Sequence, residues 1–269
     1  MKHIRLQAAF LKVAVLISAL LPVLSTLAWS QKTSQSNPSS STLVLDFDSR
    51  VSNAQGQAAA AKLLQALGGA DEVIAVKTLR QKVTIVKQGQ RIEGDQTIVY
   101  PDKQAQKMRL PQGTVLRVVT PTSAFMVTGS KVQDLSARES ASSQAALKHD
   151  FLNVLQHLHD KRYAFDAIGD GNVGDTVATV VDVSADGVPT RWWIGPDGKL
   201  LQERFTDTGQ DTPTTLTFRY SDWKKFGGLD YPTKYLLLDE GDNTVLTMTL
   251  TAMEINPDVD SKIFEKPAK

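Results

Sequence analysis

The sequence predicts a mainly β protein of the α+β class, in which about eleven antiparallel strands form a sheet that curls toward a barrel. Segments with a two-residue period follow one another from Leu79 to Ile255, and Gly, Pro, Asn or Asp residues separate them. Consecutive strands joined by tight turns are antiparallel neighbours. Only two stretches of the chain after residue 53 have helical spacing. These observations favour a meander over an alternating α/β fold.

Composition limits the possible classes of protein. The chain has 269 residues, of which 41% are hydrophobic and 22% charged, which is enough for one main domain with a sizeable core. The net charge of +1 provides no field that would attract nucleic acid. Cysteine is absent, which excludes disulfides, thiolate metal sites, a cysteine nucleophile and a lipidated N-terminal cysteine.

The N-terminus has the pattern of an export signal. A short basic start precedes an apolar run to Ala28, and Ala28-Trp29-Ser30 has the small-x-small pattern of a cleavage site. We predict a signal peptide over 1–30, a disordered tether over 31–53 and a folded domain over 54–269. The alternative is an uncleaved anchor in the inner membrane, because the apolar run approaches the length that spans a bilayer.

Helix signals occur at two places. Ala54 to Leu67 contains good helix formers and ends at Gly68-Gly69, and Asp71 to Val76 allows a second turn. Ser136 with Glu139 fits a capping box, and apolar residues then recur at helical spacing through His159. This second helix interrupts the meander and needs the apolar surface of the sheet.

Strands are predicted on both sides of that helix from alternation and turn residues. The first group is Leu79–Ile85, Ile92–Tyr100, Met108–Leu110, Val115–Val119 and Phe125–Val127. The second group is Arg162–Ile168, Thr176–Val183, Thr190–Ile194, Leu200–Phe205, Thr214–Trp223, Tyr231–Leu238 and Val245–Ile255, with Gly169–Gly174 as a loop.

Two acidic motifs suggest metal chemistry when taken alone. Asp46-Phe47-Asp48 resembles the nucleophile strand of haloacid-dehalogenase-type phosphatases, but those enzymes alternate strands with helices, whereas this chain has consecutive strands. Asp170, Asn172 and Asp175 offer three oxygen ligands, and calcium takes six to eight. The tether and an ordinary turn explain these residues better.

Other candidate catalytic residues lack partners at a useful spacing. His149, His157 and His159 are not spaced to lie side by side on a helix, so we expect surface histidines. Ser142 and Ser143 lack a nucleophile-elbow motif, so we expect them only to start the helix. We therefore predict no enzyme, no metal and no cofactor.

Trp192-Trp193 lies in a predicted strand, where adjacent side chains point to opposite faces. One indole must enter the core, and the other must lie outside or under a covering segment. The alternative is that one of them lines a ligand cavity.

Several short segments resemble one family when they are read in order. They are Ala66-Leu67-Gly68-Gly69, Val76-Lys77-Thr78-Leu79-Arg80, Tyr100-Pro101-Asp102-Lys103, Asp197-Gly198-Lys199-Leu200-Leu201, Tyr220-Ser221-Asp222-Trp223, Tyr231-Pro232, Glu254-Ile255-Asn256-Pro257 and Phe264-Glu265-Lys266-Pro267. With the signal peptide and the order of helices and strands, they resemble the LolA/LolB-type outer-membrane lipoprotein-sorting superfamily, over about Leu63 to Pro267.

This resemblance implies an incomplete, strongly curved barrel whose concave apolar face is covered by helices. It also implies a periplasmic, non-enzymatic carrier that holds acyl chains of lipids or lipoproteins in that cavity. The alternative is an envelope accessory module with a filled barrel, which binds another envelope protein. We expect a monomer with no nucleic-acid partner.

Strand alternation nominates the residues that would line the lipid cavity. The candidates are Val83, Ile85, Ile98, Met108, Phe125, Val127, Trp192, Ile194, Leu216, Phe218, Leu246 and Met248.

Overall fold

The computed structural model describes residues 51–267. The predicted signal peptide (1–30), the tether up to residue 50 and the motif at Asp46 lie outside the described residues. None of the helices within 51–267 has both the length and the apolar composition needed to cross a membrane.

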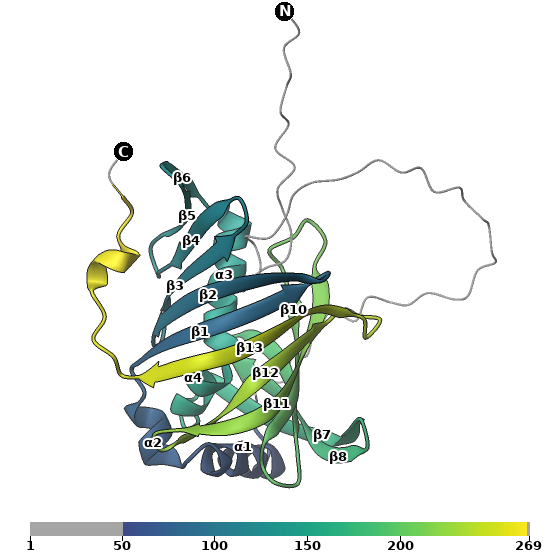
Figure 1. The fold of residues 1–269 in the computed structure, drawn as a ribbon. Helices are drawn as coiled ribbons and strands as arrows, with labels where there is room; N and C mark the ends of the chain where they lie inside the picture. The colour runs from purple at the N-terminus through teal and green to yellow at the C-terminus, as the bar shows by residue number, and fades with distance from the viewer. Residues whose placement is uncertain (1–50, 268–269) are drawn as a thin grey trace, which may run out of the picture.

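One antiparallel sheet of 13 strands forms the body of the protein (Figure 1). Its order is β6-β5-β4-β3-β2-β1-β13-β12-β11-β10-β9-β8-β7. The first half consists of β1 (Thr78–Lys87), β2 (Gln90–Val99), β3 (Lys103–Leu110), β4 (Gly113–Val119), β5 (Ala124–Thr128) and β6 (Lys131–Asp134). The second half consists of β7 (Tyr163–Val173), β8 (Thr176–Ala185), β9 (Val188–Ile194), β10 (Leu200–Asp207), β11 (Thr214–Phe226), β12 (Leu229–Leu238) and β13 (Thr244–Ile255).

The two halves meet where the first strand pairs with the last. In this pairing Leu79 of β1 lies opposite Ile255 of β13. The strands β6 and β7 therefore occupy the two edges of the sheet, although only one connecting segment separates them in sequence. This segment contains α3 (Ala137–His149) and α4 (Phe151–Gln156), and it must cross from one edge of the sheet to the other.

The helices cover one face and one end of this sheet (Figure 1). Besides α3 and α4, they are α1 (Ala54–Ala66) and α2 (Ala70–Ala75). The 3-10 turn η1 (Ser261–Phe264) instead packs against Val118 and Phe125, in a cluster separate from the main core. Asn53 caps α1, and its backbone N–H donates to the Phe165 carbonyl of the edge strand β7. Gly56 allows this close approach, because a Cβ there would lie 2.2 Å from the Phe165 oxygen.

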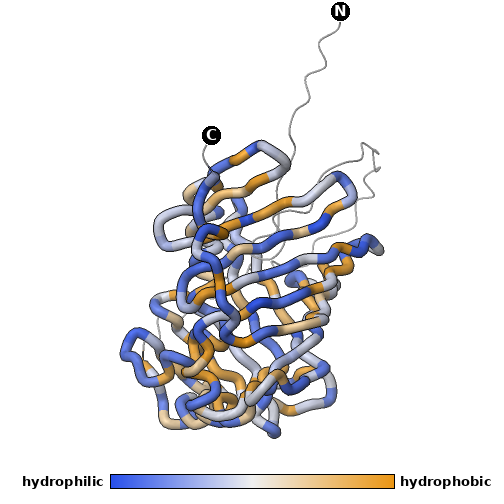
Figure 2. The backbone as a smooth tube through the Cα atoms, turned by 60° about the vertical axis from the view of Figure 1, so that its left-hand side comes forward, coloured by the Kyte–Doolittle hydropathy of each residue, from blue (hydrophilic) through white to orange (hydrophobic). Residues whose placement is uncertain are grey.

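Apolar residues form one main core and two smaller clusters on the sheet. The main core includes residues of β1 to β5, β7 to β13 and all four α-helices. A second cluster joins Phe125 and Val118 to Phe264 of η1, and a third surrounds Trp193. Figure 2 shows apolar and polar residues alternating along many of the strands, as expected for a sheet that buries one face more than the other.

The structure confirms a mainly β fold with an unclosed antiparallel sheet, and it corrects three details. There are more strands than the predicted eleven or so, partly because β6, with the sequence Lys-Val-Gln-Asp, has no apolar alternation. The stretch predicted as a loop over Gly169–Gly174 continues β7 to Val173 through an irregularity near Gly169. The long second helix breaks at Asp150, whose side chain accepts hydrogen bonds from the first backbone N–H groups of α4.

The prediction for the paired tryptophans is confirmed. Trp192 is fully buried in the main core, and Trp193 lies in the third cluster. Arg204 covers the Trp193 ring at 5.4 Å from its centroid.

Candidate functional site

A cavity of about 90 Å³ lies between the sheet and the α3–α4 segment. Strands from both halves of the sheet line it, together with α3 and the start of α4. Its wall is rich in aromatic rings: Phe151, Phe205, Phe218, Tyr220, Tyr231 and Tyr235. The rings of Tyr220 and Tyr235 meet edge to face with their centroids 5.4 Å apart. This aromatic wall gives the cavity a rigid shape.

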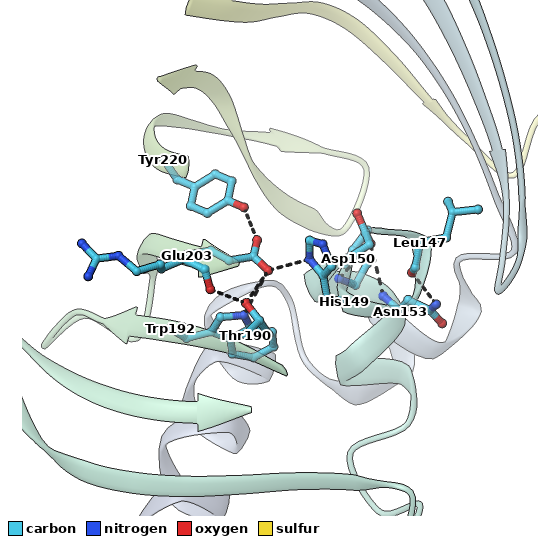
Figure 3. A network of polar contacts seen from close by, with 10 residues as sticks. Leu147, His149, Asp150, Asn153, Thr190, Trp192, Glu203 and Tyr220 are labelled. Carbon is cyan, nitrogen blue, oxygen red and sulfur yellow. Dashed lines mark hydrogen bonds and ion pairs between the residues drawn. The ribbon is translucent and has the colours of Figure 1, made fainter. Parts of the chain in front are cut away.

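A buried carboxylate, Glu203 of β10, organises the polar side of the cavity (Figure 3). Its Oε2 accepts a 2.6 Å hydrogen bond from the Tyr220 hydroxyl. Its Oε1 lies 2.9 Å from Nδ1 of His149 and accepts a 3.0 Å bond from Thr190. The Trp192 indole N–H is 3.5 Å from the same oxygen. Both oxygens of Glu203 are thus satisfied by the protein.

These contacts decide the ionisation of Glu203. Burial alone raises the pKa of a carboxyl group, but the charge of His149 and the hydrogen bonds from His149, Tyr220 and Thr190 outweigh it. The pKa of Glu203 therefore lies below its ordinary value. At neutral pH the carboxylate is ionised and holds α3 to the sheet through His149.

A second carboxylate, Asp150, lies at the break between α3 and α4 (Figure 3). Its Oδ1 accepts a 3.0 Å hydrogen bond from the Tyr100 hydroxyl and further bonds from the backbone N–H groups of Leu152 and Asn153. Burial is the largest influence on its pKa and raises it to about 6, although these hydrogen bonds oppose the rise. Asp150 therefore changes its charge in the physiological range of pH.

Three glutamines form a polar row on the cavity side of β1, β2 and β3. Gln81, Gln96 and Gln104 are each buried and line the cavity. Gln81 and Gln96 face each other across neighbouring strands. Because strand neighbours of these residues, such as Leu79 and Ile98, belong to the main core, the row interrupts an apolar face.

The α3 helix is attached to the sheet mainly by polar contacts. Three of its five buried residues are polar, namely Ser142, Ser143 and His149. Ser142 donates a 2.8 Å hydrogen bond to Asp207 of β10, and Arg117 of β4 donates to Ser143. By contrast, α4 buries four apolar residues: Phe151, Leu152, Val154 and Leu155. The two helices are therefore held by different kinds of contact.

These findings correct the sequence-based interpretation of two groups of polar residues. His149 is not a surface histidine but is 7% exposed and paired with Glu203. Ser142 and Ser143 do not merely start the helix, because both are buried and bonded to the sheet. Their partners lie far away in sequence, so spacing within α3 gave no signal.

In the described part of the chain, the Thr190 and Tyr220 hydroxyls donate to the carboxylate of the histidine–carboxylate pair and not to the histidine. Within residues 51–267, no serine or threonine hydroxyl forms a hydrogen bond with His149. No group of three or more His, Asp or Glu side chains in this range is placed to hold a metal ion.

The candidate lipid-binding residues fall into three places. Ile98, Phe218 and Met248 line the cavity. Seven others lie in the main core outside the cavity lining: Val83, Ile85, Met108, Trp192, Ile194, Leu216 and Leu246. Phe125 and Val127 lie in the second cluster, where they pack with η1 residues instead of facing the cavity.

The polar residues of the site were not nominated from sequence. The sequence could have indicated the glutamine row, because Gln81 occupies a core-facing position between Leu79 and Val83. Buried amides at such positions need partners or a ligand. Glu203 gave no comparable signal, since its partners come from three other elements of the fold.

No protein-family model matches this sequence, and no match was found among curated proteins. Solved structures do share the fold. A DUF1329 family protein from Desulfovibrio piger matches 78% of this chain and 97% of its own, with 12% identity and a TM-score of 0.51. A LolA superfamily protein from Nitrosomonas europaea matches 77% of this chain and 97% of its own, with 13% identity and a TM-score of 0.50.

This chain has a LolA-like fold. An outer membrane lipoprotein-sorting protein domain from Vibrio parahaemolyticus is also similar over 78% of this chain and 96% of its own, with 10% identity and a TM-score of 0.49. The expectation of a LolA-like incomplete barrel is confirmed. At these identities, the similarity describes the fold and leaves function to be argued from the site.

Proposed function

We propose that this LolA-like protein is a non-enzymatic carrier or chaperone of the periplasm, which binds the apolar part of a lipid or lipoprotein on the concave face of its sheet. The observation that most supports this proposal is the cavity between the sheet and the α3–α4 segment. The resemblance of the sequence to lipoprotein-sorting proteins and the signal-peptide pattern support the location. Acyl burial contributes about 0.8 kcal/mol per CH₂, so binding needs no catalytic residue.

The size of the cavity means that an acyl chain cannot enter unless α3 moves. A volume of about 90 Å³ corresponds to roughly three water molecules, whereas an apolar cavity of about 150 Å³ holds benzene. The polar contacts of α3 can be replaced by water when the helix lifts, whereas moving α4 would expose its apolar side chains. We therefore expect α3 to open from the break at Asp150 while α4 stays in place.

Lipid binding can be tested on the mature protein purified from a periplasmic extract. Native mass spectrometry followed by lipid extraction detects a bound lipid, and a fluorescent fatty acyl probe measures saturable uptake. Ala146 of α3 lines the cavity, and Ala146→Phe should fill it and abolish uptake. The control is Ala145→Phe, at the next position of α3 and outside the cavity lining.

A discrete acyl adduct and uptake that only Ala146→Phe abolishes would support the carrier. A bare mass together with no saturable uptake would count against it. Equal uptake by the wild type and both variants would show that the probe binds elsewhere on the protein.

The small volume of the cavity favours a second candidate, an envelope accessory module with a filled barrel. Ile168 and Val177, on the β7–β8 hairpin at the edge of the sheet, are 49% and 59% exposed. Such side chains can contribute to contact with another envelope protein. Cross-linking in intact cells from a cysteine placed at 177 tests this alternative, because the chain has no cysteine of its own.

A further inference from the structure

The cavity contains polar groups that the protein itself does not satisfy. Gln104 is only 6% exposed and lines the cavity, and no hydrogen bond joins its side-chain amide to another of the described residues. Gln96 uses its Oε1 to accept a 3.0 Å bond from Gln106, and no contact occupies its NH₂ group within the same range. Buried amides are normally hydrogen-bonded, so these groups indicate a missing polar partner in the cavity.

Asp150 also lacks hydrogen-bond partners on one side, and unlike the glutamines it carries a charge. All of its hydrogen bonds within residues 51–267 are accepted by Oδ1, which leaves Oδ2 free to bind a donor in the cavity. Its charge acts on Tyr231 across the cavity, where it adds to the larger effect of burial in raising the pKa of that tyrosine. Asp150 and the aromatic residues line the same cavity.

The charges around the cavity favour a cation. Two carboxylates and one histidine line it, and no lysine or arginine of the described chain does so. Glu203 has His149, Tyr220 and Thr190 as partners, whereas neither a lysine nor an arginine of the described chain lines the cavity beside Asp150. Buried charges in proteins are normally paired. The two carboxylates would repel a phosphate or carboxylate group held against them, whereas they and the faces of aromatic rings attract cations.

Volume limits the size of this cation. A space of about 90 Å³ is smaller than the roughly 150 Å³ that accommodates benzene, so a group of a few heavy atoms fits. A primary ammonium also supplies several N–H donors, which matches the free acceptors of Asp150 and Gln104.

We propose that the cavity binds a small alkylammonium group, of the size of ethanolammonium, with Asp150 as its counter-ion, Gln104 as a hydrogen-bond partner and the tyrosine and phenylalanine rings as its walls. This inference deepens the proposed function, because it assigns a headgroup chemistry to the same site. The ammonium can belong to a lipid headgroup or to a free soluble amine.

Calorimetric titration of the mature protein at pH 7.5 tests the proposal with two probes of matched shape. Ethanolammonium and ethylene glycol differ mainly in whether one end is charged. We expect saturable binding of ethanolammonium and none of ethylene glycol in the same concentration range. Asp150→Asn, in which asparagine keeps the helix cap, should weaken the binding of ethanolammonium by at least about tenfold. Asp175→Asn, which removes an exposed carboxylate in the β7–β8 turn, is the control and should leave binding unchanged.

Gln104→Met provides a second variant with a distinct readout. Methionine has a similar length but no amide, so we expect binding of ethanolammonium to weaken by about threefold to tenfold. The melting temperature should stay the same or rise, because an unpartnered buried amide is removed. A purely structural role of Gln104 would instead lower the melting temperature.

Lysolipids below their micelle concentration separate the two sources of the ammonium. Tighter binding of lysophosphatidylethanolamine than of lysophosphatidylglycerol supports a headgroup site. Saturation by free ethanolammonium, with no preference between the lysolipids, supports a soluble amine. The proposal is overturned if ethanolammonium binds no better than ethylene glycol and the two lysolipids bind equally. It is also overturned if the binding of ethanolammonium is unchanged in Asp150→Asn.

Failure of the ammonium site and failure of the carrier function give different results. If the fluorescent acyl probe binds while no ammonium preference is found, the carrier stands and the ammonium site fails. If ethanolammonium binds through Asp150 while the acyl probe does not bind, the ammonium site stands and the carrier fails.

Discussion

The ionisation of Asp150 should make the free protein less stable at alkaline than at mildly acidic pH, and Asp150→Asn should remove this dependence. Asparagine resembles the protonated carboxyl group in size and remains a good helix N-cap, so it tests the charge rather than the shape. Because Tyr100 and the α4 backbone donate only to Oδ1, the amide oxygen of asparagine can accept the same bonds.

The direction of this change in stability with pH follows from proton binding. The pKa of Asp150 is raised from 3.8 to about 6, so between these values the folded protein holds a proton that the unfolded chain has lost. This contribution to stability is complete below about pH 4 and is lost as pH rises through about 6. The change from 3.8 to about 6 corresponds to about 3 kcal/mol at about 1.4 kcal/mol per pH unit. Partial exposure to the cavity lowers this to about 2 kcal/mol.

Urea unfolding followed by tryptophan fluorescence measures the effect, since Trp192 is fully buried. At pH 8 we expect Asp150→Asn to raise the free energy of unfolding by about 2 kcal/mol, and at pH 5 by about half as much. The control Asp175→Asn should change neither value, because Asp175 is exposed. A gain of the same size at both values of pH, or a loss at pH 8, would refute the argument that the buried charge is costly.

Three further changes test other parts of the fold. Glu203→Gln should lower the free energy of unfolding at pH 7 by about 2–4 kcal/mol, because His149 loses its carboxylate partner. Urea titrations measure this, and a loss below about 1 kcal/mol would contradict it. Phe264→Ala should cost about 1–3 kcal/mol and make the C-terminal segment sensitive to limited proteolysis, since this ring anchors the second cluster; unchanged cleavage would show another anchor. Gly56→Ala should lower the melting temperature despite the better helix propensity of alanine, because its Cβ would collide with the Phe165 carbonyl; an unchanged melting temperature would mean that α1 shifts freely.

Local chemistry determined much of the fold in advance. Period-two alternation placed most strands, and the adjacent Trp192 and Trp193 had to lie on opposite faces wherever the strand went. The capping box at Ser136 and Glu139 forms as predicted, and the double glycine ends α1. These features depend on residues that are close in sequence, so the sequence alone contains their cause.

Other elements were missed because a local pattern was weak or was overridden. The polar strand β6 pairs only with β5 at the edge of the sheet, where backbone hydrogen bonds suffice without a buried side-chain face. The long helix was predicted to be continuous, but Asp150 accepts backbone hydrogen bonds as an N-cap and receives the Tyr100 hydroxyl from the first half of the sheet. Only that tertiary contact fixes the side chain at the break.

The sequence by itself thus determined the class of the fold, the position of most strands along the chain and the need for a covering segment. The tertiary structure decided which residues meet beneath that segment. Glu203 is 54 residues from His149, and Gln104 comes from the opposite half of the sheet. No sequence periodicity connects these positions. They reach one cavity because β1 pairs with β13 and because α3–α4 crosses from one edge of the sheet to the other.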